Sequence, residues 1–178
     1  MGGDHGPPVI LSAAIKAIQH HPDVNFTLCG DESIINPAIQ VLSDAERRRV
    51  VVSHCDQVVD MGEAPTSALR HKKRSSMRKA IELVQAKEAH ACVSAGNTGA
   101  LLTLSFYLLK TLSGIDRPAL VSMMPTASHH KVLLLDLGAN VNCTPDILFQ
   151  YGVMGSVLAQ QVAGIASPRV ALLNVGEE

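Results

Sequence analysis

Apolar residues along this chain form two kinds of pattern, short continuous runs and longer stretches with an apolar stripe. Short runs bounded by glycine, proline and small polar residues are typical of buried strands, and stripes with a spacing of three to four residues are typical of helices. The runs predict strands at 25–29, 50–54, 91–93, 120–124, 131–136 and 170–175. The stripes predict helices at 9–19, 33–42 with an interruption near Pro37, and 75–87, a helix that begins near Gly99, and a long helix from Pro145.

Strands and helices alternate in this prediction, which favours an α/β protein with a mainly parallel sheet and helices on both of its faces. The 178 residues are 47% hydrophobic, enough for a substantial core, and we expect them to form a single α/β domain, 1–178. The chain contains no internal repeat and no low-complexity segment. Between the strand at 50–54 and the helix at 75–87 we expect a loop through Gly62 and Pro65, and its segment 60–66 is too short to predict an interdomain hinge.

The sequence ACVSAGNTGA, residues 91–100, places a small-residue loop between a predicted strand and a predicted helix. Gly96 and Gly99 flank Asn97 and Thr98, so a ligand could approach the loop backbone closely. If Asn97 caps the helix, the N–H groups of Thr98, Gly99 and Ala100 remain free and favour an anion. The alternative interpretation is an ordinary strand-to-helix turn that binds nothing.

Two further loops have the same character. One contains Gly138, Asn140 and Asn142 and is followed by Thr144-Pro145-Asp146, which is typical of a helix start. The other opens the chain, where Gly2, Gly3 and Gly6 surround Asp4 and His5. If their strands lie parallel in one sheet, the three loops converge at its carboxyl edge, where α/β folds bind ligands. We therefore expect a site for a small anion.

Charge adds one local feature to this picture. The net charge is −1 and the chain has no Trp and few other aromatic residues, which argues against nucleic-acid binding. Six of the 15 basic side chains fall in ten positions without an acid: Arg70, Lys72, Lys73, Arg74, Arg78 and Lys79. This basic stretch is either a solvated surface or a binding surface for a negative partner, a protein or a substrate phosphate. Ser75 and Ser76, at the predicted helix start, would offer such a partner hydroxyl groups and free N–H groups. The smaller cluster of Arg47, Arg48 and Arg49 is expected to be solvated surface.

The spacing of the cysteines and histidines predicts no metal site, and the length of the apolar stretches predicts no membrane span. Cys29, Cys55, Cys92 and Cys143 have no zinc-site spacing and are expected to be reduced thiols. No histidine pair has the spacing of a helical metal site. The longest apolar stretch, 101–109, is about half of a bilayer span, and the amino terminus does not resemble a signal peptide. We expect a cytoplasmic protein with at most peripheral membrane contact.

Seven sequence segments, in this order, closely resemble the PlsX family of bacterial phosphate acyltransferases: MGGDHGP, HKKRSSMRKAIELV, VSAGNTGAL, IDRPAL, LDLGANV, QYGVMGS and PRVALLNVGEE. The resemblance implies an enzyme of phospholipid synthesis that moves a long-chain acyl group from acyl carrier protein to inorganic phosphate. The product, an acyl phosphate, would serve a downstream membrane acyltransferase. The resemblance also implies a homodimer and a fold related to phosphotransacetylases and to the isocitrate and isopropylmalate dehydrogenases.

That reaction needs no metal or redox cofactor, because phosphate is already an anion and the thiolate leaves readily; the protein must position phosphate and stabilise an oxyanion. We expect Asp4, Asn97 and Asn140 to be catalytic. We expect phosphate or substrate to contact Gly2, Gly3, Ser94, Gly96, Thr98, Gly99 and Gly138. The basic stretch would dock the acidic acyl carrier protein. Asp136 either orients donors, binds a proton, or only organises its loop.

The sequence also departs from the family. Its members usually carry a strand before the MGGD loop and continue well past GEE, so we expect the chain to be the amino-terminal half of the protein, with little turnover alone. Asn142 stands where the family usually has aspartate, and a neutral amide cannot act as a general base. Two other functions remain open: a phosphate- or carrier-binding fragment without activity, and a dehydrogenase, although no GxGxxG unit is present.

Overall fold

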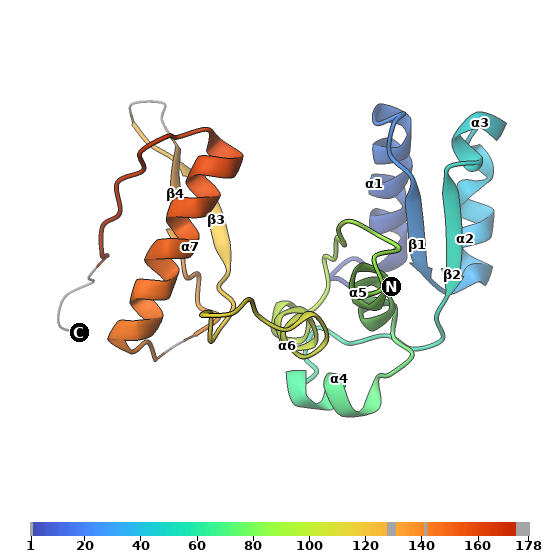
Figure 1. Ribbon diagram of the computed structural model, residues 1–178. Helices are drawn as coiled ribbons and strands as arrows, with labels where there is room; N and C mark the ends of the chain where they lie inside the picture. The colour runs from blue at the N-terminus through green and yellow to red at the C-terminus, as the bar shows by residue number, and fades with distance from the viewer. Residues whose placement is uncertain (1, 128–130, 141, 174–178) are drawn as a thin grey trace. The chain divides into compact units, whose positions relative to one another are not determined.

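The computed structural model describes residues 2–127, 131–140 and 142–173, and the chain divides into two compact units, Met1–Lys110 and Thr111–Glu178 (Figure 1). The first unit contains the elements α1 (Gly6–His20), β1 (Phe26–Gly30), α2 (Glu32–Ala38), the 3-10 turn η1 (Ile39–Val41), α3 (Asp44–Arg47), β2 (Val50–His54), α4 (Pro65–His71), α5 (Ser76–Gln85) and α6 (Thr98–Leu109). The second unit contains β3 (Val121–Pro125), β4 (Lys131–Leu135) and α7 (Pro145–Ala163).

A parallel pair of strands organises the first unit. β1 and β2 run side by side with Phe26 opposite Val50. Phe26, Leu28, Val50 and Val52 pack against a buried cluster from α1 and the α2 region: Ile18, Ile35, Ile39 and Leu42. Side chains alternate between the faces of a strand, so Thr27 and Cys29 face the opposite side, and α5 contacts β1 there. The parallel pair therefore carries helices on both faces, as the sequence predicts.

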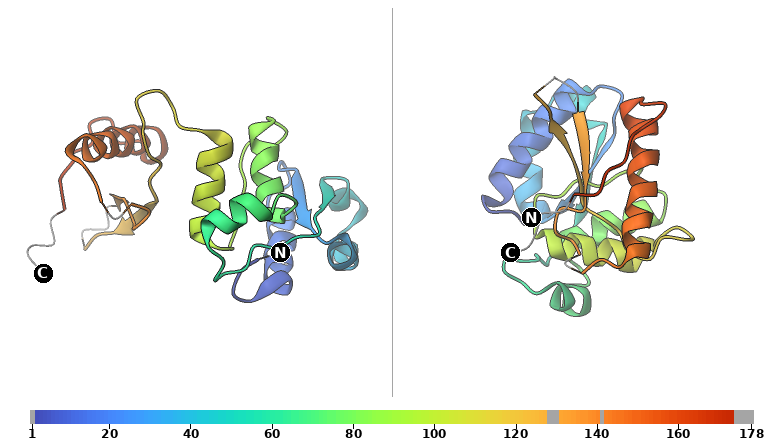
Figure 2. Two further views of the ribbon diagram at one scale, coloured as in Figure 1. Left: turned by 90° about the horizontal axis from the view of Figure 1, so that it is seen from below. Right: turned by 90° about the vertical axis from the view of Figure 1, so that its left-hand side faces the viewer.

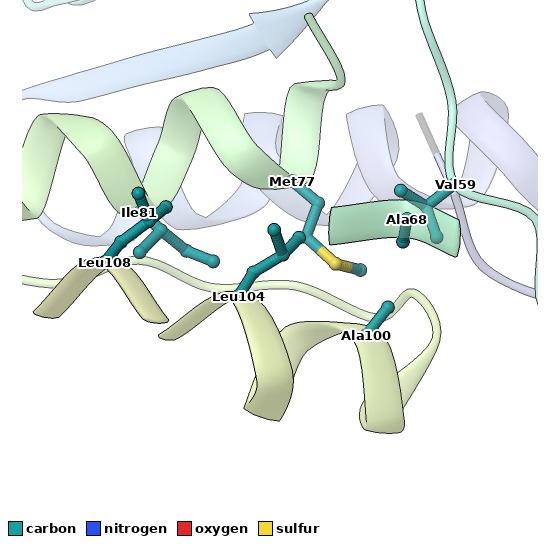
Figure 3. Close-up of a cluster of buried hydrophobic side chains, with 7 residues drawn as sticks. All are labelled: Val59, Ala68, Met77, Ile81, Ala100, Leu104 and Leu108. Atoms are coloured by element: carbon teal, nitrogen blue, oxygen red, sulfur yellow. The ribbon is translucent and has the colours of Figure 1, made fainter. Parts of the chain in front are cut away.

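A second core joins α4, α5 and α6, in which α6 contacts both α4 and α5 (Figure 2). Its buried side chains, drawn in Figure 3, are Val59, Ala68, Met77, Ile81, Ala100, Leu104 and Leu108. Ile81 and Leu104 are fully buried. Truncating one such side chain to alanine typically costs about 2–5 kcal/mol. This packing fixes the start of α6, where the sequence predicts an anion site.

The second unit pairs β3 with β4 in antiparallel register, with Val121 opposite Leu135, and α7 packs against β4. Thr144 caps α7, because its hydroxyl accepts a hydrogen bond from the Ile147 N–H group at 3.4 Å. Pro145 occupies the first turn, and Gly164 ends the helix in a left-handed conformation with φ of 68°. The predicted start of this helix is confirmed.

The predicted α/β class is confirmed, but four features differ from expectation. β3 and β4 are antiparallel, because residues 126–130 are too few to form a parallel crossover. Residues 91–93 form no strand, and neither do residues 170–173; positions 174 and 175 lie outside the described residues. Residues 65–71 form α4 where we expected a loop, since Pro65 is suited to the first turn of a helix. The assignment of residues 1–178 to one domain stays a prediction.

Two arginines that we expected to be solvated instead bind backbone carbonyls. The Arg49 guanidinium donates hydrogen bonds to the carbonyl oxygens of Ile18 (2.7 Å), His21 (3.0 Å) and Val24 (2.7 Å), at the end of α1. Arg47 donates to the carbonyl oxygens of Gln40 and Leu42. Each arginine satisfies carbonyl groups at a helix or turn end. The surface prediction holds only for Arg48, which is exposed.

None of the helices within the described residues is both long enough and apolar enough to span a bilayer.

Candidate functional site

Two of the three glycine loops lie directly against each other in the first unit. A side chain on Gly2 would meet the Val59 carbonyl oxygen at 3.2 Å and the Gly96 Cα at 3.5 Å. A side chain on Gly3 would meet the Ala95 carbonyl oxygen at 3.2 Å, and Gly3 has a φ of +105°, which favours glycine. The structure therefore brings the loop at 2–6 and the loop at 94–99 together, with glycine at the contact.

Asn97 is the structural centre of the second loop. It is 8% exposed, and its side-chain oxygen accepts a hydrogen bond from the Ala100 N–H group at 2.9 Å, which confirms the predicted helix cap. Its amide nitrogen lies within 3.2 Å of three backbone carbonyl oxygens, those of Asp60, Met61 and Glu63. Both amide hydrogens are thus used inside the protein. The geometry gives Asn97 a positioning role, and a direct catalytic role stays a prediction.

The start of α6 offers two donors rather than the three that we expected. The Ala100 N–H group bonds to Asn97, so our expectation that it is free is wrong. Within the described part of the chain, the N–H groups of Thr98 and Gly99 have no acceptor. Thr98 is exposed, whereas Gly99 lies so close to Pro65 that a Cβ atom would be 3.0 Å from the proline ring. The two N–H groups and the helix dipole behind them suit an anion.

Ser94 lies in the same loop as these donors, and Asp4 directly follows Gly3, which contacts Ala95 of that loop. The Ser94 hydroxyl accepts a hydrogen bond from the Gly96 N–H group at 3.1 Å and so stabilises the turn before the helix. Asp4 and His5 are exposed in the turn that precedes α1, and His5 does not cap that helix with its side chain. Asp4 is therefore accessible to a ligand, and its catalytic role stays a prediction.

The third glycine loop lies in the second unit and is organised by Asp136. The Asp136 carboxylate accepts hydrogen bonds from the Leu120 N–H group at 2.8 Å, from the Asn140 N–H group at 2.7 Å and from the Asn140 side chain at 3.0 Å. Burial opposes ionisation, but these bonds and one from the Ala139 N–H group outweigh it and hold the pKa of Asp136 below its ordinary value. Asp136 is therefore an ionised acceptor that organises the loop.

Asn140 shares that role. Its amide nitrogen also donates to the Pro118 carbonyl oxygen at 3.0 Å, so it bridges the IDRPAL segment and the loop that Gly138 opens at φ +85°. Asn142 is exposed. The catalytic role of Asn140 and the substrate contact of Gly138 stay predictions, as does convergence of all three loops.

The basic stretch is less positive than the sequence implies, because acids from other positions pair with half of it. Three ion pairs form: Lys72–Glu63 at 3.7 Å, Arg74–Asp56 at 2.8 Å and Arg78–Glu82 at 2.7 Å. Across the described residues, Arg70, Lys73 and Lys79 have no ion-pair partner. Only the Glu82 partner was detectable in the sequence, since it lies one helical turn beyond Arg78.

Ser75 and Ser76 do not offer the free groups that we expected at the start of α5. Both side chains are buried. The Ser75 hydroxyl donates to the Lys72 carbonyl oxygen at 2.8 Å and accepts from the Arg78 N–H group, which makes it the helix cap. The Ser76 N–H group donates to the Gln57 carbonyl oxygen at 3.3 Å. That expectation is wrong, because the Ser75 hydroxyl caps α5 and bonds to Lys72, and the Ser76 N–H group bonds to Gln57 in the segment after β2.

The cysteines of the first unit are protonated structural thiols. Burial raises the pKa of Cys29 to about 11, and burial also raises the pKa of Cys55 and of Cys92 above the ordinary value. All four cysteines are free. Within the described ranges, no three His, Cys, Asp or Glu side chains gather in a way that could hold a metal ion.

Comparison with known proteins identifies the family. A family model described as "Fatty acid synthesis protein" matches residues 1–178. The chain belongs to this fatty acid synthesis protein family. Proteins named "Phosphate acyltransferase" are similar to it over its whole length: one from Pseudoalteromonas atlantica is 57% identical, one from Halorhodospira halophila 52%, and one from Coxiella burnetii 51%.

The chain spans about half the length of these curated relatives, since the matched residues make up 52% of each. The resemblance to phosphate acyltransferases that the sequence motifs indicate is confirmed. The family match places the two contacting glycine loops, the Asp136–Asn140 loop and the basic stretch all within the shared region.

Proposed function

We propose that this member of the fatty acid synthesis protein family provides part of a phosphate acyltransferase, which transfers a long-chain acyl group from acyl carrier protein to inorganic phosphate. The observation that carries the proposal is the similarity of the whole chain to proteins named phosphate acyltransferase. The loop at 94–99 supports it, because it presents the free Thr98 and Gly99 N–H groups at the amino end of α6, a 12-residue helix, and lies against the glycine loop at 2–6.

The proposed reaction suits this geometry. A phosphate oxygen attacks the thioester carbon, a C–O bond forms, the C–S bond breaks, and the sulfur leaves as the thiolate of the carrier's prosthetic arm. The Thr98 and Gly99 N–H groups supply fixed donors for the phosphate or for the oxyanion that develops on the carbonyl. Asn97 holds both donors in position through its bonds to Ala100 and to the 60–63 segment.

The test follows acyl phosphate directly. The complete polypeptide encoded by the gene is incubated with palmitoyl acyl carrier protein and inorganic phosphate, and the product is trapped with hydroxylamine. We expect a palmitoyl hydroxamate whose formation requires phosphate. Release of free palmitate without phosphate would identify a thioesterase instead, and reduction of a nicotinamide would identify a dehydrogenase.

The exposed cations of the basic stretch are proposed to dock the acidic carrier. Arg70 is exposed and, within the described ranges, has no ion-pair partner, so its charge is available to a partner at little desolvation cost. Arg74 and Arg78 are poorer probes, since reversing either charge would also disrupt an ion pair within the protein.

The Arg70→Glu variant tests this docking surface. Exposed charges act mainly by steering association, so the KM for palmitoyl acyl carrier protein should rise about three- to tenfold at low ionic strength with kcat unchanged. The difference should shrink as salt is added. Lys16→Glu, which reverses an exposed lysine on α1, is the matched control. Equal KM values for Arg70→Glu and the control would show that Arg70 does not dock the carrier and is only solvated surface.

A further inference from the structure

A cavity of about 310 Å³ lies at the carboxyl end of β2, beside α5. One wall is the end of the strand and the residues after it: His54, Cys55 and Asp56. The other wall is α5 and the residues before it: Lys73, Arg74, Lys79 and Glu82. We call this the basic cavity. It lies at the edge of a parallel strand pair where α/β proteins bind ligands. One of its walls belongs to the basic stretch, for which the sequence alone left open whether a protein or a phosphate binds.

The two carboxylates of the basic cavity are already engaged. Asp56 pairs with Arg74 at 2.8 Å, and Glu82 pairs with Arg78 at 2.7 Å. Lys73 and Lys79 have no acid within ion-pair distance in the described part of the chain. The positive charge of the cavity therefore comes from two lysines with ammonium groups that have hydrogens to donate.

The remaining groups that line the basic cavity are uncharged or are hydrogen-bond donors. The Glu32 N–H group donates to Nδ1 of His54 at 3.3 Å, so in the neutral ring Nε2 carries the hydrogen and is a donor. Cys55 is buried, and burial raises the pKa of its thiol, so it adds no negative charge. The cavity thus offers two ammonium groups, one imidazole N–H group and one partly neutralised guanidinium. This set of donors suits a compact ligand with several acceptor oxygens and at least one negative charge.

We propose that the basic cavity binds a phosphoryl group through Lys73 and Lys79. A phosphoryl group offers acceptor oxygens on several sides, which matches donors on both walls, and the cavity is large enough for it. If the proposed function holds, two molecules of the reaction carry such a group: inorganic phosphate, and the phosphodiester of the carrier's pantetheine arm. Binding of the group itself does not depend on that function.

A direct binding assay tests the basic cavity independently of the acyl-transfer reaction. Inorganic phosphate, 4′-phosphopantetheine and pantetheine are titrated into the complete polypeptide by calorimetry, without any thioester present. We expect at least one of the two phosphorylated ligands to bind, and pantetheine, which lacks the phosphate, to bind at least tenfold more weakly than 4′-phosphopantetheine. Binding of phosphate alone identifies the substrate, and binding of 4′-phosphopantetheine alone identifies the carrier arm. If neither binds, the proposal is wrong.

Substitutions of Lys73 and Lys79 test whether the phosphorylated ligand binds in the basic cavity. Lys73→Met and Lys79→Met should each weaken binding of the phosphorylated ligand about tenfold, the usual effect of losing one charge-assisted hydrogen bond. Lys16→Met removes an exposed charge on α1, outside the cavity, and should change binding less than twofold. Lys79→Arg keeps the charge and should restore most of the affinity, which distinguishes binding from loss of folding. Wild-type affinity in both methionine variants would overturn the proposal, whatever the acyltransferase assay shows.

Discussion

Asn97 has two structural roles, as the cap of α6 and as a donor to three backbone carbonyl oxygens. Its role as helix cap could be predicted, because a cap depends only on the residues that follow it in the chain. Its bonds to the carbonyl oxygens of Asp60, Met61 and Glu63 could not, since those groups are more than 30 residues away in sequence and are brought close by the packing of α4 against α6. The residue that we predicted to be catalytic is thus first of all the one that holds the loop.

Replacing Asn97 tests that positioning role. Asn97→Ala removes the cap and the side-chain donor to the carbonyl oxygens of Asp60, Met61 and Glu63, of which, within the described residues, only that of Asp60 keeps another backbone donor, the Glu63 N–H group. The free energy of unfolding should therefore fall by about 2–4 kcal/mol in urea denaturation. Asn97→Asp keeps an acceptor for the Ala100 N–H group but turns a carboxylate toward the carbonyls, so it should also destabilise. Asn25→Ala, at an exposed position, is the control and should change stability by less than about 0.5 kcal/mol. Wild-type stability of Asn97→Ala would show that the loop is held by other contacts.

At the scale of elements, local sequence signals predicted the ends of helices correctly, but the apolar pattern did not predict which segments pair as strands or in which direction. The ends of α7 follow from Thr144, Pro145 and Gly164, which act within one turn. Residues 91–93 have strand-forming side chains, yet a strand also needs a neighbouring backbone edge, and the described residues supply none; Val93 is 96% exposed. The direction of β4 relative to β3 depends on the connection between them, which an apolar pattern does not report.

The end of α1 provides a prediction of its own. The Arg49 guanidinium, which comes from just before β2, binds three carbonyl oxygens at and after the last turn of α1. Arg49→Ala should therefore lower the free energy of unfolding by about 1.5–4.5 kcal/mol, since each of the three net hydrogen bonds contributes about 0.5–1.5 kcal/mol. The adjacent Arg48→Ala is the matched control, because Arg48 is exposed and its side chain bonds to nothing among the described residues. Equal stability of the two variants in urea would contradict a capping role for Arg49.

At the scale of the whole molecule, the sequence predicted the class of fold better than the arrangement of the glycine loops. The contact between Gly2 and Gly96 joins two of the three predicted loops. The Asp136 loop forms as a complete hydrogen-bonded unit around Asn140, but in the second unit of the chain. Acids far from the basic stretch in sequence, Asp56 and Glu63, neutralise part of it. These outcomes depend on packing between distant segments, which periodicity along the chain does not report.

The boundary between the two units gives the last prediction. Lys110 is exposed at the end of α6, its backbone adopts a φ of +65°, and its ammonium group lies 4.8 Å from the centre of the Tyr107 ring. Both buried clusters of the first unit lie entirely before it. Cleavage after Lys110 therefore leaves those cores intact, whereas cleavage at Arg78 or Lys79 requires α5 to open.

Limited trypsin digestion should accordingly release a fragment ending at Lys110 before fragments from within the first unit accumulate, as followed by mass spectrometry over time. The Lys110→Gln variant removes the trypsin site and should lose this fragment without losing stability, since the side chain makes one exposed contact with Tyr107. The same fragment, expressed on its own, should unfold cooperatively in urea because both cores are complete within it. Early cleavage inside α5 or α6 would instead mean that the first unit depends on the rest of the chain for its stability.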